Sequence, residues 1–72
     1  MKKIKKIKIK INGKFLVISQ NLSLSIFLKV LKIPLKKVAI ELNQEIIDKN
    51  KINKINLKKN DKIEIVHFIG GG

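Results

Sequence analysis

The chain has 72 residues, enough for one small domain with one modest core, so we expect a single domain spanning residues 1–72. It contains no cysteine, which excludes disulfides and thiolate metal sites. It contains a single histidine, His67, which excludes a histidine metal cluster. The formal net charge is +12, from 17 lysines and no arginine.

A lysine excess of this size would usually indicate nucleic acid or an anionic membrane as the partner. Lys, Ile and Asn, however, supply 39 of the 72 residues, and A/T-rich codons encode all three. Arginine, which reads guanine and phosphate through two hydrogen bonds, is absent, as are Tyr and Trp for base stacking. We therefore expect no specific nucleic-acid partner, although a basic nucleic-acid-binding module remains the alternative from a different functional class.

The first half of the chain predicts a hairpin after a basic extension at residues 1–6. Lysines interrupt every apolar stretch through Lys10, so we expect no signal peptide, no membrane association and a cytoplasmic location. Apolar residues alternate with period two at residues 7–11, which predicts a strand, and the largely apolar residues 14–18 are the predicted returning strand. Asn12-Gly13 between them predicts a tight turn, because both residues tolerate positive φ.

A helix of ten residues is predicted from Leu24 to the residue before Pro34. Ser23 is the expected N-cap, and Leu22 has the spacing of a hydrophobic staple with Phe27. The predicted buried face has the i, i+3, i+4, i+7 spacing and consists of Leu24, Phe27, Leu28 and Leu31.

The second half predicts three more strands. Residues 38–42 alternate with Val38, Ile40 and Leu42 facing inward, a turn follows at residues 43–44, and residues 45–47 can form a short strand. Residues 48–57 suggest a loop with a helical turn, and residues 62–68 form the last strand. This order predicts an α+β, grasp-like fold: a mixed sheet of four to five strands, crossed by one helix, whose first and last strands run parallel.

The last strand also predicts a docking surface. If Ile63 and Ile65 face the core, parity places Val66 and Phe68 on the outer face. Ala39 and Glu41 occupy the corresponding face of residues 38–42. An exposed apolar patch is a natural docking surface, so the predicted partner-docking residues are Val66, Phe68, Ile69, Ala39 and Glu41. The alternative is that Phe68 folds over the sheet edge; His67 is expected to be a partly buried edge residue.

The chain ends in Gly70-Gly71-Gly72. Glycine has no Cβ, so we expect residues 69–72 to form a flexible tail thin enough for a narrow channel, with the Gly72 carboxylate as the reactive group. A disordered tail or an artificial extension is the alternative. No catalytic constellation and no metal site are expected from the side chains.

Four segments resemble the sulfur carrier protein family of thiamine biosynthesis, a ubiquitin-like β-grasp group. They are Ile-Asn-Gly-Lys at 11–14, Val-Ala-Ile-Glu-Leu-Asn at 38–43, Asp-Lys-Ile-Glu-Ile-Val-His-Phe at 61–68 and Gly-Gly at 71–72. The chain departs from the family pattern at Gln44, where a glycine is common, and at Asp48-Lys49, where Pro-Arg is common.

The resemblance implies a carrier that is a co-substrate and not an enzyme. A partner adenylyltransferase would use ATP to adenylate the Gly72 carboxylate, a persulfide-bearing protein would convert it to a thiocarboxylate, and thiazole synthase would take the sulfur. The carrier itself would bind no cofactor. The remaining alternatives are the small subunit of molybdopterin synthase, which usually has prolines before its tail, and a ubiquitin-like protein modifier.

Overall fold

The computed structural model describes residues 5–68. Its elements follow the predicted order: β1 (Lys6–Ile11), β2 (Lys14–Ser19), α1 (Leu24–Val30), η1 (Leu35–Lys37), β3 (Val38–Leu42), β4 (Glu45–Ile46), η2 (Lys49–Lys54) and β5 (Lys62–His67), where η marks a 3₁₀-helix. β1 begins one residue earlier than predicted, and β5 ends one residue earlier. The predicted helical turn within residues 48–57 is η2.

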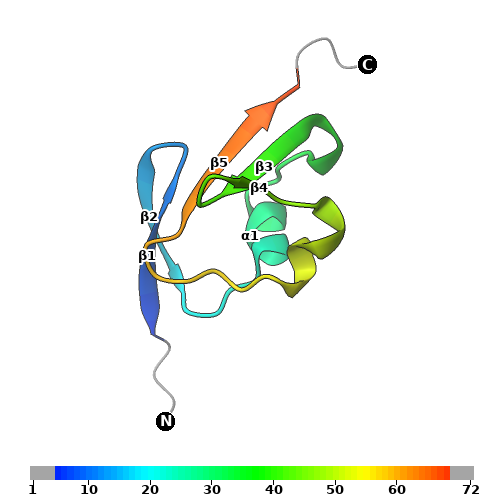
Figure 1. Cartoon of the computed structure of the whole chain (residues 1–72). Helices are drawn as coiled ribbons and strands as arrows, with labels where there is room; N and C mark the ends of the chain where they lie inside the picture. Colours follow the sequence, from blue (N-terminus) through cyan, green and yellow to red (C-terminus); the bar gives the residue numbers. More distant parts are fainter. Residues whose placement is uncertain (1–4, 69–72) are drawn as a thin grey trace.

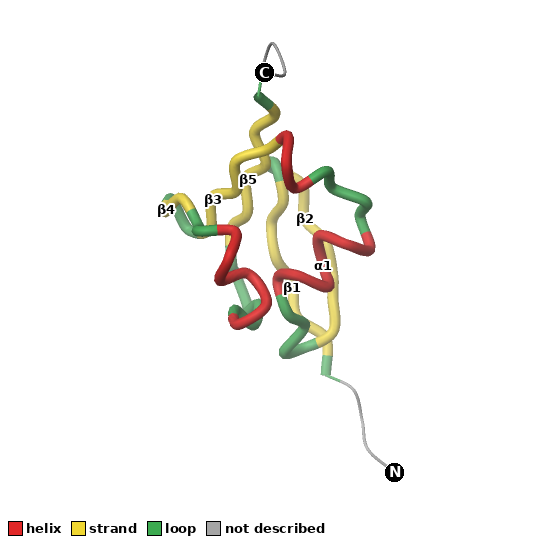
Figure 2. Tube along the Cα trace, turned by 90° about the vertical axis from the view of Figure 1, so that its right-hand side faces the viewer, coloured by secondary structure: helices red, strands yellow, loops and turns green. Residues whose placement is uncertain are grey.

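The five strands form one mixed sheet in the order β2-β1-β5-β3-β4 (Figure 1). β1 pairs with β5 in parallel, and the other neighbours are antiparallel, which confirms the predicted parallel pairing of the first and last strands. β5 is therefore the central strand. Figure 2 looks onto the sheet with α1 and η2 in front of it, so the helical segments cover one face. We call this the inner face and the opposite one the outer face.

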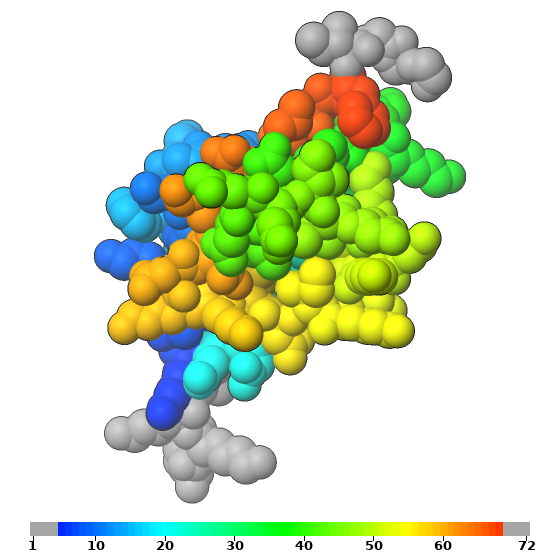
Figure 3. Space-filling model, viewed as in Figure 1, coloured from blue at the N-terminus to red at the C-terminus, as the bar shows by residue number. Residues whose placement is uncertain are grey.

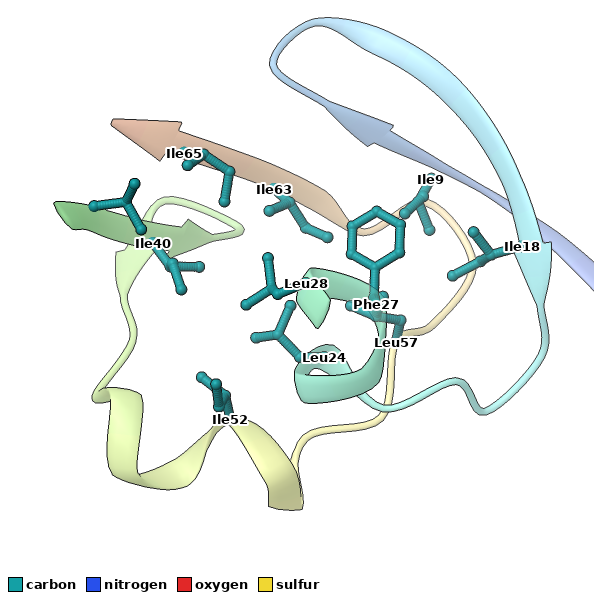
Figure 4. Packing of buried hydrophobic residues seen from close by; sticks show 11 residues of the cluster. Ile9, Ile18, Leu24, Phe27, Leu28, Ile40, Ile52, Leu57, Ile63 and Ile65 are labelled. Carbon is teal, nitrogen blue, oxygen red and sulfur yellow. The ribbon is translucent and has the colours of Figure 1, made fainter. Parts of the chain in front are cut away.

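The core lies between the inner face and α1. Phe27 of α1 points toward Ile9 of β1, while Leu24 and Leu28 face the other side of the core (Figure 4). The buried apolar residues are Ile9, Ile18, Leu24, Phe27, Leu28, Val38, Ile40, Ile52, Leu57, Ile63 and Ile65. The core supports β5 through Ile63 and Ile65, which confirms the predicted parity of the last strand.

Both hairpins turn through residues with positive φ. Asn12 has φ of 47° and Gly13 has φ of 83°, the pair of values that a type I′ turn requires. The turn between β3 and β4 also has two positive values, 53° at Asn43 and 74° at Gln44. Gln44 thus occupies a left-handed position that glycine adopts without a Cβ penalty, which explains physically why a glycine suits this position.

α1 is shorter than predicted. Ser23 is the N-cap as expected, since its Oγ accepts a hydrogen bond of 3.1 Å from the Ile26 N–H. The helix ends at Val30, because Lys32 adopts a left-handed conformation with φ of 60°. Pro34, which was expected to end the helix, therefore lies beyond its end. The Ile33 N–H donates to the Leu28 carbonyl and the Lys32 N–H to the Lys29 carbonyl, both at 3.0 Å, which is a Schellman motif.

This early end corrects the predicted buried face. Leu31 is the C-cap residue and is 39% exposed, so its assignment to the core was wrong. Leu24, Phe27 and Leu28 are buried as predicted. No helix in the described part of the chain has the length and apolar character needed to span a bilayer.

Candidate docking site at the end of the sheet

The predicted docking residues of β3 and β5 lie side by side on the outer face. Ala39 pairs with Val66, and Glu41 pairs with Glu64, in the antiparallel register of the two strands. Directly paired residues share a face, so these four side chains form a compact group. Val66 is 51% exposed and Ala39 is partly buried. The structure therefore brings together Val66, Ala39 and Glu41.

Ile46 is a further member of this group and was not predicted. Ile46 pairs with Glu41 on the other side of β3 and therefore lies on the same outer face. It is 75% exposed, the highest exposed fraction among the large apolar side chains described. The sequence contained the signal for this position. A two-residue turn at Asn43-Gln44 pairs Leu42 with Glu45, and therefore Glu41 with Ile46.

The pairing of Glu41 with Glu64 brings two carboxylates onto neighbouring strands. Like charges directly opposite each other destabilise a sheet. Lys62, one step along the same face of β5, pairs with Lys10 of β1, so the outer face changes from acidic to basic across the sheet. The acidic pair is bordered by the apolar residues Ile46, Ala39 and Val66. A partner can therefore make both ionic and apolar contacts with this surface.

Phe68 follows β5 and is held by its backbone. Its N–H donates to the Lys37 carbonyl at 2.9 Å, which continues the β3–β5 ladder one step further. The side chain is 56% exposed, so the predicted exposure is confirmed. The Lys49 Nζ lies 5.3 Å from the ring centroid, a cation–π contact that sequence analysis did not anticipate. Figure 3 shows this end of β5 in red, beside the green residues that precede β3.

His67 corrects the sequence analysis. It pairs with Val38 and has the inward parity, but it is exposed and not partly buried. The reason is visible in Figure 1, where β5 projects past the end of α1 that covers the inner face. Ile69, Gly70, Gly71 and Gly72 lie outside the described residues, so the predicted tail and its reactive carboxylate have no structural description here.

No set of three His, Cys, Asp or Glu side chains within residues 5–68 is arranged to hold a metal ion. Among the residues that the structure describes, Asp61 is the one buried charged residue, and it serves the fold. Its carboxylate accepts hydrogen bonds from the Lys58 N–H at 2.8 Å and from the Asn43 side-chain amide at 3.0 Å. The bond from Lys58 closes the turn before β5, and the bond from Asn43 joins that turn to the turn after β3. Together they fix the two strands that carry the docking residues.

A family model described as the ThiS family matches residues 3–72. The chain belongs to the ThiS family. The fold agrees, because a crystal structure of the thiamine biosynthesis protein ThiS from Geobacter metallireducens superimposes with a TM-score of 0.81 at 28% identity. That match covers 92% of this chain and 100% of the other. The ubiquitin-like β-grasp architecture implied by the sequence is thereby confirmed.

Two curated proteins are similar to this chain over part of their length. The sulfur carrier protein ThiS of Bacillus subtilis is 51% identical over 37 residues, which cover 51% of this chain and 56% of that protein. The thiazole synthase of Paramagnetospirillum magneticum is 38% identical over 65 residues, which cover 90% of this chain and 20% of that protein. The chain thus spans about a fifth of the thiazole synthase and about half of the carrier.

Proposed function

We propose that this ThiS-family chain carries sulfur on the Gly72 carboxylate for thiazole formation in thiamine biosynthesis. The observation that carries the proposal is the position of the exposed side chains of Val66 and Ile46 beside the partly buried Ala39. Val66 lies on the central strand β5, Ala39 on the neighbouring β3 and Ile46 on the edge strand β4, and the sequence continues from β5 into Gly70-Gly71-Gly72. A partner that holds this face has the C-terminal glycines within reach, because only Ile69 separates Phe68 from Gly70 in the sequence.

The chemistry begins with activation, because a carboxylate is a poor acyl donor. The Gly72 carboxylate attacks the α-phosphorus of ATP in a partner adenylyltransferase, and pyrophosphate leaves. The terminal sulfur of a persulfide on a donor protein then attacks the acyl carbon, and AMP leaves. A thiol cleaves the resulting S–S bond and is oxidised, and the carrier is left with a C-terminal thiocarboxylate.

In this proposal, side chains on the outer face of the carrier bind the partner enzyme, and the C-terminal glycines extend into its active site. Val66, Ala39 and Ile46 supply apolar contact, while Glu41 and Glu64 offer a carboxylate pair to basic groups of the adenylyltransferase. Small, unbranched Gly71 and Gly72 pass a narrow entrance to the ATP site. ATP belongs to the partner in this scheme, and the proposed compartment is the cytoplasm.

Thiazole synthase is the proposed acceptor of the sulfur. The support is the similarity of this chain to a fifth of a protein named thiazole synthase, which indicates that carrier and synthase domains can share one polypeptide. The family match favours this role over the small subunit of molybdopterin synthase. A protein-modifier role would instead require isopeptide bonds between Gly72 and target lysines.

Carrier-dependent exchange of labelled pyrophosphate into ATP tests the activation step. The assay uses the adenylyltransferase from the same organism and the full chain. We expect exchange with the full chain and none with a form lacking Gly72. Exchange that proceeds equally without Gly72, with an enzyme of demonstrated activity, would contradict the proposal.

A further inference from the structure

A second apolar surface lies at the opposite edge of the sheet from β4. A groove of about 400 Å³ runs between β2 and α1. Its lining residues are Lys6, Leu16, Val17, Ile18, Ser19, Leu22, Phe27, Val30 and Leu31. The docking residues of β3, β4 and β5 do not contribute to it, so it is distinct from the site described above.

The groove follows the free edge of β2. Four consecutive residues of this strand, from Leu16 to Ser19, line it. Successive side chains of a strand point to opposite faces, so a groove that touches four in a row must run along the edge. β2 is the terminal strand of the sheet and spans six residues, whereas β4 at the other edge spans two. Of the two edges in residues 5–68, β2 is the one long enough to accept another strand.

Exposed apolar side chains border this edge from both elements. Val17 is 58% exposed on β2, and Val30 is 70% exposed at the end of α1. Leu31, which the Schellman motif places just beyond the helix, is 39% exposed. An edge strand next to an apolar groove is the arrangement used for β-augmentation, in which backbone hydrogen bonds provide affinity and the groove selects alternate side chains.

The charge around the groove defines the partner. All five acidic residues of the chain lie between Glu41 and Glu64, and the first 40 residues carry 11 lysines with no acid. The N-terminal hairpin and α1, which form the groove, therefore have no carboxylate within their own part of the chain to neutralise them. Lys6 lies in the groove wall itself. A second copy would bring like charges together across the new strand pair, which is unfavourable.

We propose that this groove binds an extended, acidic segment of a partner protein, which adds to β2 as a further strand. The acidic side chains of the segment lie on the same side of the sheet as Lys6, Lys8 and Lys10, which share the outer face of the hairpin. Its apolar side chains enter the groove between Leu16 and Val30. Lysines near a sheet edge oppose self-association, and here they do so while leaving the edge open to an acidic strand.

The inference is independent of the sulfur chemistry, since it involves neither the C-terminal glycines nor the outer-face group. The probe is a fluorescein-labelled heptapeptide that alternates glutamate with valine or isoleucine. Fluorescence anisotropy measures its binding to the full chain at low and high salt. We expect saturable binding that weakens with salt, and no binding of the same peptide with lysine in place of glutamate.

Two substitutions locate the binding. Val17→Glu places a negative charge at the edge, and we expect it to weaken binding about tenfold or more. Ile46→Glu is the control, because it makes the same kind of change at an exposed residue of the opposite edge strand. We expect it to leave the peptide affinity within about twofold of the parent, because charges further apart than a Debye length are screened. Circular dichroism of both variants checks that the fold is retained.

Amide chemical-shift mapping by NMR decides between the groove and general charge attraction. We expect peptide-induced shifts in β2 and in the last turn of α1. Shifts confined to the lysines of the outer face would overturn the proposal. Full displacement of the peptide by an oligothymidine of equal charge, with the same residues affected, would also overturn it and indicate nucleic acid. A form lacking Gly71 and Gly72 must bind the peptide normally, which separates this test from that of the carrier function.

Discussion

The side-chain amide oxygen of Asn12 accepts a hydrogen bond of 2.8 Å from the backbone N–H of Ile65. The two residues are 53 positions apart in the chain. Asn12 also donates its own backbone N–H to the Ile63 carbonyl at 2.9 Å. One turn residue thus extends the parallel β1–β5 ladder past the end of β1 and holds the strand that leads to Val66 and the C-terminal glycines.

Removing this side chain tests the link between turn and central strand. Asn12→Gly keeps a residue that adopts φ of 47° but leaves the partly buried Ile65 N–H without its acceptor. We expect a loss of about 1–2 kcal/mol in the free energy of unfolding, measured by urea denaturation. Asn12→Asp is the matched control, because Asp retains an acceptor and tolerates a left-handed conformation. An equal loss in both variants would show that the hydrogen bond is not responsible.

Gln44→Gly is expected to stabilise the protein. Gln44 has φ of 74° in the turn between β3 and β4, where glycine has no Cβ penalty. We expect a gain of about 0.5–1 kcal/mol in the free energy of unfolding, after the larger entropy of glycine in the unfolded chain is subtracted. Gln20→Gly is the control, since Gln20 lies in a turn without positive φ and should gain nothing. Equal effects of the two substitutions would refute the conformational explanation.

Lys32→Gly tests the end of α1. Lys32 occupies the left-handed position of the Schellman motif, where glycine is preferred. We expect a stability gain of about 0.5–1 kcal/mol and a higher Tm by calorimetry. Lys29→Gly, three residues earlier and inside the helix, should instead cost about 1 kcal/mol. A destabilised Lys32→Gly protein would show that the lysine side chain contributes more than its backbone strain costs.

Val66→Glu tests the docking face. It adds a third carboxylate beside Glu41 and Glu64 and removes an exposed apolar contact. We expect kcat/KM for adenylation to fall about tenfold or more, mainly through KM, with little change in stability. Ile26→Glu provides the comparison, because Ile26 is 52% exposed on α1 and lies outside both proposed surfaces. Similar losses in the two variants would point to a general charge effect and remove the docking face from the proposal.

Local patterns predicted most of the framework. The alternation in residues 7–11, the Asn12-Gly13 turn and the apolar run after it were enough to predict the hairpin. The inward parity of Ile63 and Ile65 was enough to assign the two faces of β5. Strand parity also predicted the exposure of Val66 and Phe68. These predictions succeed because a period of two and a turn signal are both carried by neighbouring residues.

The errors have non-local or unusual causes. α1 ends at Val30 because Lys32, two residues later, is left-handed. A lysine at such a position gives no helix-stop signal in the sequence, whereas a glycine would, so Leu31 was wrongly predicted to be buried. His67 follows the inward parity but passes beyond the covering helix. The Asn12–Ile65 bond and the contact of Lys49 with Phe68 depend on the tertiary arrangement of distant segments. Ile46 was missed because residues 45–47 were assigned as a strand without assigning its faces.

The most direct measurement of the central claim is the intact mass of the full chain after incubation with ATP, the adenylyltransferase and a persulfide donor. The proposal predicts a mass gain equal to the replacement of one oxygen by sulfur, confined to the C-terminal peptide that contains Gly72. It also predicts that the gain is lost on incubation with thiazole synthase and its other substrates. An unchanged mass with partner enzymes of demonstrated activity, or a sulfur atom on any residue other than Gly72, would contradict it.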